Sequence, residues 1–349
     1  MDPITHAISG AVLARTVPKK PIPPRQVWLL ILLAMAPDSD ILLRLFSDPV
    51  YLQHHRGLTH SLLMLPLWVW LIFSFSSRRI KKEPAMPLLI ALALLLHIGL
   101  DLITTFGTMV FAPLTDQRIS FDLVFIIDPL FSACLLIPLL SGLIWKPYAR
   151  TLGVFAFTLA FSYLALTWHN QQQGVDLARK TYPDAMAYHA LPMAFSPYNW
   201  QLIVEYPDEY IRTAVNLKPE FAGLRPLFSN RFATSLLSTS ISDANHLSWQ
   251  TLPAMHTLEG MEQLPGTAFY SWFARYPVII RQEHDFIDLG DLAFGAGAPG
   301  VRSSFRLHID LSDKPGNDGQ PPRTWLIWRG DHQSELTQHF APFRWLPSN

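Results

Sequence analysis

The chain has 349 residues and is rich in hydrophobic residues, which make up 50% of the sequence, whereas charged residues make up only 15%. Soluble domains usually carry about 25% charged residues, and the mean hydropathy of +0.19 also disfavours a wholly soluble protein. The composition excludes a disordered chain, a coiled coil and a strongly basic nucleic-acid-binding protein. The one cysteine, Cys134, lies in an apolar run, which excludes a disulfide framework and a cysteine-based zinc finger.

The formal net charge of zero hides two halves of opposite charge. Residues 1–174 carry 13 Lys and Arg against 9 Asp and Glu, and residues 175–349 carry 14 against 18. The long apolar segments also lie in the first half. We therefore predict a mainly α-helical integral membrane domain over residues 1–170, followed by a soluble α+β domain over residues 171–349.

The first two apolar segments, Ile4–Val17 and Gln26–Ala36, are short and are joined by a proline-rich break that a helix cannot traverse. They predict a helical hairpin, and whether it spans the membrane fully stays open. The four later stretches approach the length of about 20 residues that a helix needs to cross a bilayer core of about 30 Å. The four expected transmembrane helices are Thr59–Ser77, Met86–Gly107, Leu123–Trp145 and Thr151–Trp168.

Basic residues in the connecting loops predict the orientation. Three loops hold nine of them, and the opposite loops hold two. Because short cytoplasmic loops carry an excess of Lys and Arg, we expect these three loops in the cytoplasm and the C-terminal domain outside it. The nine residues are Lys19, Lys20, Arg25, Arg78, Arg79, Lys81, Lys82, Lys146 and Arg150.

The second half contains short alternating or aromatic-rich segments that predict β-strands. Helices are predicted at Pro226–Leu237 and around Leu258–Tyr270, and GNDGQPP predicts a loop. The clusters Glu283–Asp285 and Asp331–His332 lack metal-ligand spacing and indicate polar surface positions. The strand candidates are residues 201–206, 210–217, 272–280, 302–311 and 323–330.

Ionisable residues inside apolar membrane segments are costly, so their presence demands a reason. In the first half they are mainly His and Asp, the residue types that hold a divalent metal ion through imidazole nitrogen and carboxylate oxygen. The candidate ligands are His6, Asp38 and Asp40 in APDSD, His55 and His60 in HRGLTHS, and His97 and Asp101 in HIGLD.

The spacing of these residues limits how they can act together. His97 and Asp101 are four residues apart and share one helix face, as metal ligands or as a buried hydrogen-bonded pair that locks two helices. His55 and His60 cannot share a helix face, and Thr59 is a candidate helix N-cap.

The predicted topology brings His or Asp from four independent segments to one depth on the outer side, which favours a metal site. Seven candidate ligands exceed the four that bind one zinc ion, so either two or three ions bind or some residues orient the ligands. A multi-metal site suits phosphoester hydrolysis, because the ions activate water and stabilise charge on the attacking and leaving oxygens.

The motifs MDPITHAISG, APDSD, HRGLTHS and HIGLDLITTFG, in this order, resemble the LexA-regulated, membrane-bound metal-dependent hydrolase family. These are inner-membrane proteins distantly similar to zinc-dependent phospholipase C. The resemblance covers residues 1–170 and implies a hydrolase of the bacterial inner membrane that uses a divalent metal, first of all zinc, with manganese and magnesium as alternatives. It implies metal-site roles for His6, Asp38, Asp40, His55, His60, His97 and Asp101.

We expect hydrolysis of a phosphoester in a membrane lipid or lipid-linked substrate at the outer face, with Asp38 or Asp40 as general base or as the residue that orients the attacking water. Membrane lipids are the expected partners, and nucleic acid is not. Arg56 could bind phosphate, although extension to the lipid headgroups is its default role. Supporting contacts are expected from Thr104, Thr105 and Asp122.

Two alternatives stay open. The first is a metal-binding or transport-related membrane protein without catalysis, because intramembrane His and Asp also mark transport pathways. The second is a structural scaffold whose His–Asp pairs hold helices together while the outer domain binds a partner.

Overall fold

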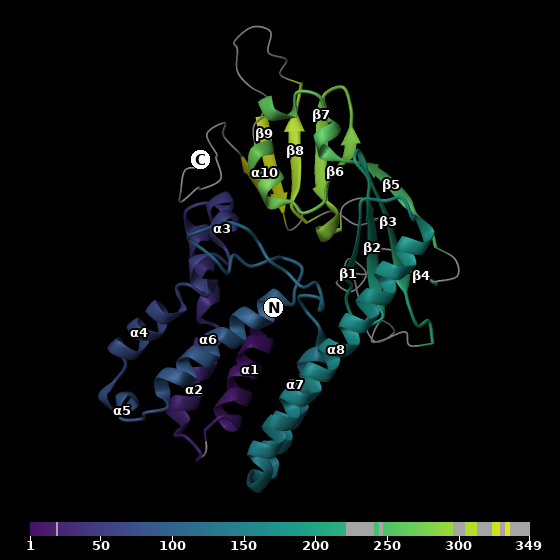
Figure 1. Cartoon of the computed structure of the whole chain (residues 1–349). Coiled ribbons are helices and arrows are strands. Elements are labelled where there is room, and N and C mark those ends of the chain that lie inside the picture. Colours follow the sequence, from purple (N-terminus) through teal and green to yellow (C-terminus); the bar gives the residue numbers. More distant parts are fainter. Residues whose placement is uncertain are drawn as a thin grey trace. The chain divides into compact units, whose positions relative to one another are not determined.

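The computed structural model describes residues 1–18, 20–220, 241–243, 247–264, 266–295, 304–312, 323–328 and 332–335. The chain divides into two compact units, one made mainly of residues 1–44 and 54–169, the other of residues 45–53 and 170–343. It passes from the first unit to the second within the long helix α8 (Ala149–Thr181; Figure 1).

The N-terminal part of the chain is helical. The helices α1 (Pro3–Thr16) and α2 (Pro24–Leu33) pack together as the expected hairpin and are followed by the 3-10 segment η1 (Ala36–Leu45). The later elements are α3 (Asp48–His54), η2 (Leu58–His60), α4 (Leu65–Phe75), α5 (Arg78–Lys81), α6 (Met86–Leu102), α7 (Pro129–Ile144) and η3 (Lys146–Tyr148).

Two of these helices, α1 and α7, begin with an Asp N-cap followed by a proline. The Asp2 carboxylate accepts the N–H of Thr5 at the start of α1, and the Asp128 carboxylate accepts the N–H groups of Leu130 and Phe131 at the start of α7. Proline suits the first helical position because it has no N–H to leave unpaired. The sequence therefore fixes where α1 and α7 begin.

Helix α1 lies in the core of the first unit and packs against α2, α6 and α7. Its residues Val12 and Leu13 are almost fully buried in two apolar clusters. Gly10 lets α2 approach closely, since a Cβ atom there would lie 2.8 Å from the carbonyl oxygen of Leu30 and 2.9 Å from the Cβ of Ala34. This contact sets the position of the C-terminal end of α2.

Among the described residues, one helix is long and apolar enough to cross a membrane by itself: the 36 residues Lys146–Thr181, which contain α8 and the expected span Thr151–Trp168. The other three expected spans contain the shorter helices α4, α6 and α7, so four transmembrane helices are not confirmed. The difference arises because the apolar runs extend into non-helical backbone, at residues 61–64 before α4 and 123–128 before α7.

Two bent pairs of helices could add to this count. The pair Pro24–Leu33 and Ala36–Leu45 bends by 52°, and the pair Asp48–His60 and Leu65–Phe75 bends by 77°. Each pair passes the same length and composition test when its two parts are taken together, as a broken span or a re-entrant loop would.

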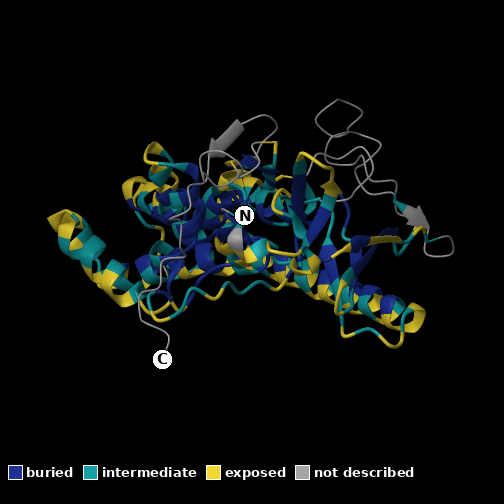
Figure 2. Ribbon diagram, turned by 90° about the horizontal axis from the view of Figure 1, so that it is seen from above, coloured by how far each residue is buried: buried dark blue, intermediate teal, exposed yellow. Residues whose placement is uncertain are grey.

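The exposed surface of the first unit carries many large apolar side chains. Helix α4 buries none of its residues, and its Trp70 and Phe75 are 62% and 87% exposed. Among the described residues from 170 onward, only Met186 is an exposed large hydrophobic side chain. Figure 2, which is coloured by burial, shows exposed faces along the helices and largely buried strands. An exposed apolar surface of this extent suits a lipid environment.

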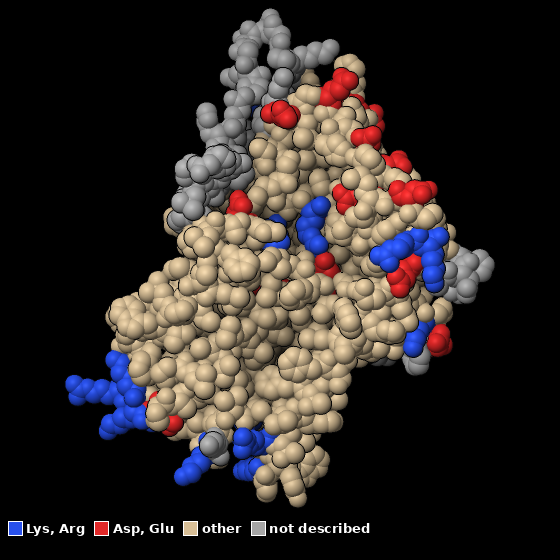
Figure 3. Space-filling view, in the orientation of Figure 1, with Lys and Arg blue, Asp and Glu red and all other residues tan. Residues whose placement is uncertain are grey.

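Charged side chains are distributed unevenly over the first unit. In Figure 3 its Lys and Arg side chains gather at the lower end, where Figure 1 shows α5, and the surface above them is almost free of charge. The basic loops that predicted the orientation thus lie at one end of the unit.

The second unit contains two five-stranded sheets. The first sheet has the order β1 (Ala187–Pro192), β2 (Asn199–Glu205), β3 (Glu209–Asn216), β4 (Ser242–Asp243), and β5 (Gln250–Pro253) also pairs with β3. The second has the order β10 (His332–Glu335), β9 (Arg323–Trp328), β8 (Arg306–Asp310), β7 (Phe286–Asp291), β6 (Pro277–Gln282).

All pairings in these sheets are antiparallel except the parallel pair β3–β4. The first sheet packs the fully buried Trp200 and Leu202 with Ala178 of α8, where Gly174 allows close approach to Leu202.

Most strand predictions are confirmed: residues 201–206 and 210–217 cover all but the first residues of β2 and β3, and residues 302–311 and 323–330 contain β8 and β9. The prediction for residues 272–280 is wrong in its first part, because Trp272 and Phe273 end the helix α10 (Thr267–Phe273), where aromatic side chains pack together. The predicted helix Pro226–Leu237 and the loop GNDGQPP lie outside the described residues.

Candidate metal centre

Elements far apart in the sequence bring the site residues together in the first unit. Asp38 and Asp40 lie in η1, which begins just after the end of α2 and contains Pro37. His60 ends η2, and the helix α6 carries His97 and Asp101 on one face. By helix rise, these two residues lie about 20 Å along α6 from its first residue, which follows the basic helix α5.

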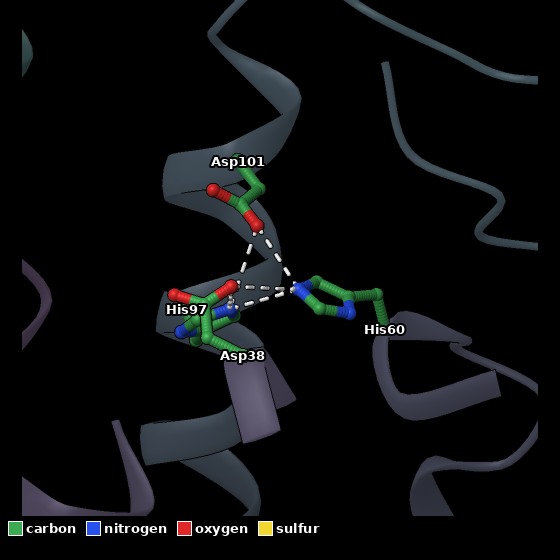
Figure 4. Close-up of side chains that lie close together, drawn as sticks. All are labelled: Asp38, His60, His97 and Asp101. Carbon is green, nitrogen blue, oxygen red and sulfur yellow. Dashed lines mark hydrogen bonds and ion pairs between the residues drawn. The ribbon is translucent and has the colours of Figure 1, made fainter. Parts of the chain in front are cut away.

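Four side chains converge on one small space (Figure 4). His60 Nε2 lies 3.0 Å from both Asp101 Oδ2 and His97 Nε2. His97 Nε2 lies 3.4 Å from Asp101 Oδ2, and Asp38 Oδ1 lies 3.6 Å from each imidazole Nε2. The side chains of His60, His97 and Asp101 are fully buried, whereas that of Asp38 is 27% exposed.

The outer nitrogens of both imidazoles have acceptors, which fixes the tautomers. His97 Nδ1–H donates to the carbonyl oxygen of Ala34 at 2.7 Å, because a carbonyl can only accept. His60 Nδ1 lies 2.9 Å from Thr59 Oγ1, whose hydroxyl donates to Asp40 at 3.2 Å. In the neutral rings both Nε2 atoms therefore carry lone pairs. Two lone pairs 3.0 Å apart repel unless a proton or a cation lies between them.

Asp40 is saturated with hydrogen bonds. Its Oδ1 accepts from His55 Nδ1 at 2.8 Å, and its Oδ2 accepts from the Arg56 N–H at 3.0 Å and from the Thr59 hydroxyl. Asp38, Asp40 and His55 form a second group of close candidate ligand atoms. Since both oxygens of Asp40 are engaged, its geometry fits a residue that orients His55 and His60, as carboxylates behind metal-bound imidazoles do.

Arg56 is buried and holds the other oxygen of Asp101. Its guanidinium lies 2.9 Å from Asp101 Oδ1 and donates to the Thr104 hydroxyl at 2.9 Å. The residue has a φ of 60°, a costly conformation outside glycine that persists where the surroundings enforce it. With Oδ1 engaged by Arg56 and the Met1 amino group, Oδ2 of Asp101 faces the histidines.

His6 lies beside the cluster and is in neither group of close ligand atoms. Its ring stacks on that of His97 with centroids 3.9 Å apart, and its Nε2 lies 3.4 Å from Asp101 Oδ1. The side chain is fully buried, and neither ring nitrogen has a hydrogen-bond partner among the described residues. Such a buried polar group is rare and costly unless something satisfies it.

All seven predicted ligands thus lie in one region, but they do not all point their ligand atoms at one position. The expectation that Arg56 extends to headgroups is wrong, because Asp101 draws its side chain inward. Thr59 does not cap η2, whose N-cap is Gly57, and its hydroxyl connects His60 to Asp40 instead. The roles of Arg56 and of the Ala34 carbonyl had no signal in the sequence, since both depend on segments brought together by folding.

The sequence profile of the YdjM inner membrane protein family matches residues 1–173, the segment that carries every site residue. The "Inner membrane protein YbcI" of Escherichia coli (strain K12) is 36% identical over 120 residues, which are 33% of this chain and 69% of that protein. The chain belongs to the YdjM inner membrane protein family. Its association with the membrane follows from that membership and agrees with the apolar surface of the first unit.

A second relative extends the comparison without adding an activity. The "Uncharacterized protein YfhP" of Bacillus subtilis (strain 168) is 28% identical over 138 residues, 37% of this chain and 42% of that protein. The chain therefore matches less than half the length of this relative. No solved structure matches the chain significantly.

Proposed function

We propose that this protein is a membrane-bound metal-dependent hydrolase that cleaves a phosphoester of a lipid or lipid-linked substrate. The observation that carries the proposal is the convergence of four candidate ligand atoms, two imidazole nitrogens and two carboxylate oxygens, on one small space (Figure 4). Family membership supports the membrane location and says nothing of the reaction.

The spacing of the four atoms fits a divalent ion. A tetrahedral zinc ion with bonds of about 2.0–2.1 Å holds its ligand atoms roughly 3.3–3.4 Å apart. The five distances among the ligand atoms of Asp38, His60, His97 and Asp101 given above range from 3.0 to 3.6 Å. Zinc is thus our first choice. The ring nitrogens of His6 make no hydrogen bond among the described residues, and Nε2 lies 3.4 Å from Asp101 Oδ1, which supports a further ion or a bound group beside the first.

The chain's own residues have distinct parts in the proposed reaction. A metal ion held by His60, His97 and Asp101, with Asp38 or water as the fourth ligand, would supply an activated water molecule when water is bound. Asp40 and Thr59 hold the imidazole of His60, and Arg56 holds Asp101, so that their ligand atoms stay in place. Asp38 is the most accessible of the four ligands and lies where a substrate would approach.

The proposed orientation is that of a multi-pass protein with the site and the C-terminal domain on the outer side. It is supported by the basic residues at one end of the first unit, and by the position of His97 and Asp101 about 20 Å further along α6. A site at the opposite end from the basic loops is within reach of outer-leaflet headgroups.

Metal content tests the site. We expect wild-type protein to contain at least one divalent ion per chain, His60→Ala to lose it, and His256→Ala, which alters an exposed histidine of the second unit, to keep it. Wild type that stays metal-free in the presence of zinc, manganese or magnesium contradicts the proposal and favours a structural His–Asp cluster.

Catalysis requires a separate measurement: release of phosphate or headgroup from mixed phospholipids by metal-loaded protein, before and after chelation. Metal-dependent release that His60→Ala abolishes supports a hydrolase. A fully metal-loaded protein that cleaves neither lipids nor simple phosphoesters would instead be a metal-binding or transport-related membrane protein.

A further inference from the structure

The connection between η2 and α4 exposes large apolar side chains beside the candidate metal centre. Leu62 and Leu63 follow His60 almost directly and are 38% and 46% exposed. Residues 108–114 lie against this connection and expose Phe111 and Leu114, which are 45% and 66% exposed. We call Leu62, Leu63, Phe111 and Leu114 the apolar rim.

Backbone hydrogen bonds tie the two segments of the rim to the site. The N–H of Leu62 donates to the carbonyl oxygen of Val110, and the N–H of Met109 donates to that of Arg56, both at 2.9 Å. The rim is therefore held by hydrogen bonds to the segment that carries Arg56 and His60. Loops that face water seldom expose four large apolar side chains at one place.

The backbone N–H groups of the connection are satisfied internally. Besides the bond of Leu62, the N–H groups of Leu63 and Met64 donate to Ser61 Oγ at 3.1 and 3.3 Å, and the Ser61 hydroxyl donates to the carbonyl oxygen of Ala112. Water would satisfy these groups in an exposed loop. At membrane depth, irregular backbone is tolerated only where the protein satisfies it.

The rim also continues into a surface that suits lipid. Helix α4 begins at Leu65, buries none of its residues and is linked to the site segment by the Trp68 indole N–H, which donates to the carbonyl oxygen of Leu58 at 2.9 Å. The segments Asp48–His60 and Leu65–Phe75 together have the length and composition of one membrane span bent by 77°. The break in that span, residues 61–64, includes half of the rim.

We propose that the apolar rim lies within the bilayer and opens the metal centre sideways to the lipid, so that the site receives a membrane-resident amphiphile. Its phosphate would reach the side of the cluster that Asp38 leaves accessible, while its acyl chains stay among the rim side chains and α4. The identity of the bound group as a substrate rests on the proposed function; the bilayer contact of the rim does not.

Site-specific labels test the position of the rim in the full-length protein. Cys134→Ser removes the one cysteine, and Phe111→Cys or Leu114→Cys then carries an environment-sensitive fluorophore in phospholipid vesicles. Gln117→Cys, at an exposed polar position of the same loop, is the matched control, and Trp70→Cys on α4 is the lipid reference.

We expect lipids spin-labelled in the acyl chain to quench the labels at 111 and 114 several-fold more than the label at 117, and to the extent seen at 70. Iodide in the water should show the reverse order. Labels at 111 and 114 that iodide quenches as strongly as the label at 117 overturn the inference, even if the protein hydrolyses lipids. Lipid-facing labels support it even if no turnover is found, so the two proposals fail separately.

Discussion

Asp38 and Asp40 are two residues apart in one motif, yet their surroundings give them different roles. Asp38 Oδ1 faces the Nε2 atoms of His60 and His97. Both oxygens of Asp40 instead accept hydrogen bonds from the segment that carries His55 and Thr59. The difference arises because the two side chains point in different directions from the 3-10 segment η1. The spacing of the two residues in the sequence does not show this.

We predict that Asp40→Asn weakens metal binding by about 10–100-fold while the ligand set stays the same, because the amide can no longer accept at both positions. The test is titration with cobalt(II), whose absorption spectrum reports the ligands. Asp40→Asn should reach the wild-type spectrum at higher metal concentration, and Asp38→Asn should change the spectrum itself. A changed spectrum in Asp40→Asn would make Asp40 a ligand.

The second prediction concerns His97 and stability. A ligand that binds only the native state adds to the free energy of unfolding, by roughly 2.7 kcal/mol at a hundred times its dissociation constant. A chelator should therefore lower the melting temperature of wild type in detergent. His97→Ala should melt lower from the start and respond little to chelation. Equal responses of both proteins would leave the His97–Asp101 pair as a structural hydrogen bond.

The packing of helix α1 against helix α2 affects a residue of the candidate metal centre. Gly10 touches Ala34, and the carbonyl oxygen of Ala34 accepts from His97. The packing of two helices in the N-terminal hairpin thus determines the orientation of an imidazole on α6. Neither the hairpin nor α6 alone contains this information.

We therefore predict that Gly10→Ala destabilises the protein by about 1–3 kcal/mol, the usual cost of overpacking, because its Cβ would meet backbone that cannot move cheaply. Metal affinity should fall with it. Gly99→Ala is the matched control on α6: its Cβ meets nothing within 4 Å, and alanine favours a helix by up to about 1 kcal/mol. Thermal melts and metal titrations of both variants measure this, and equal effects would contradict the coupling.

For the molecule as a whole, the orientation in the membrane is predicted from the charges of the loops. The helices of the first unit differ widely in length and do not indicate it. We predict that a reporter fused after Asn349 is active only outside the cytoplasm, whereas a reporter inserted after Lys82 is active only inside it. Both reporters on one side of the membrane would refute the orientation. Activity outside the cytoplasm after Lys82 would also place the site away from outer-leaflet lipids.

The division into an apolar helical half and an α+β half, the hairpin, five of the ten strands in whole or in part and the identity of the candidate ligands could be predicted from the sequence. These features are local. Helices and strands are predicted by the periodicity of apolar residues, and the candidate ligands are indicated by His and Asp in apolar segments, where ionisable residues are costly. The helical parts of the expected spans are shorter than hydropathy indicated for the same reason, because hydropathy counts apolar residues such as Leu62 and Ile126 whether or not they are helical.

Which candidates face one another follows from the packing of the helices. This packing placed Asp38 with His60, His97 and Asp101, set Asp40 behind His60, and turned Arg56 inward. These outcomes depend on distances between η1, η2 and α6, which are separated in the chain by loops and set by packing such as that at Gly10. A ligand set is a property of converging side-chain directions, and convergence exists only once the helices are packed.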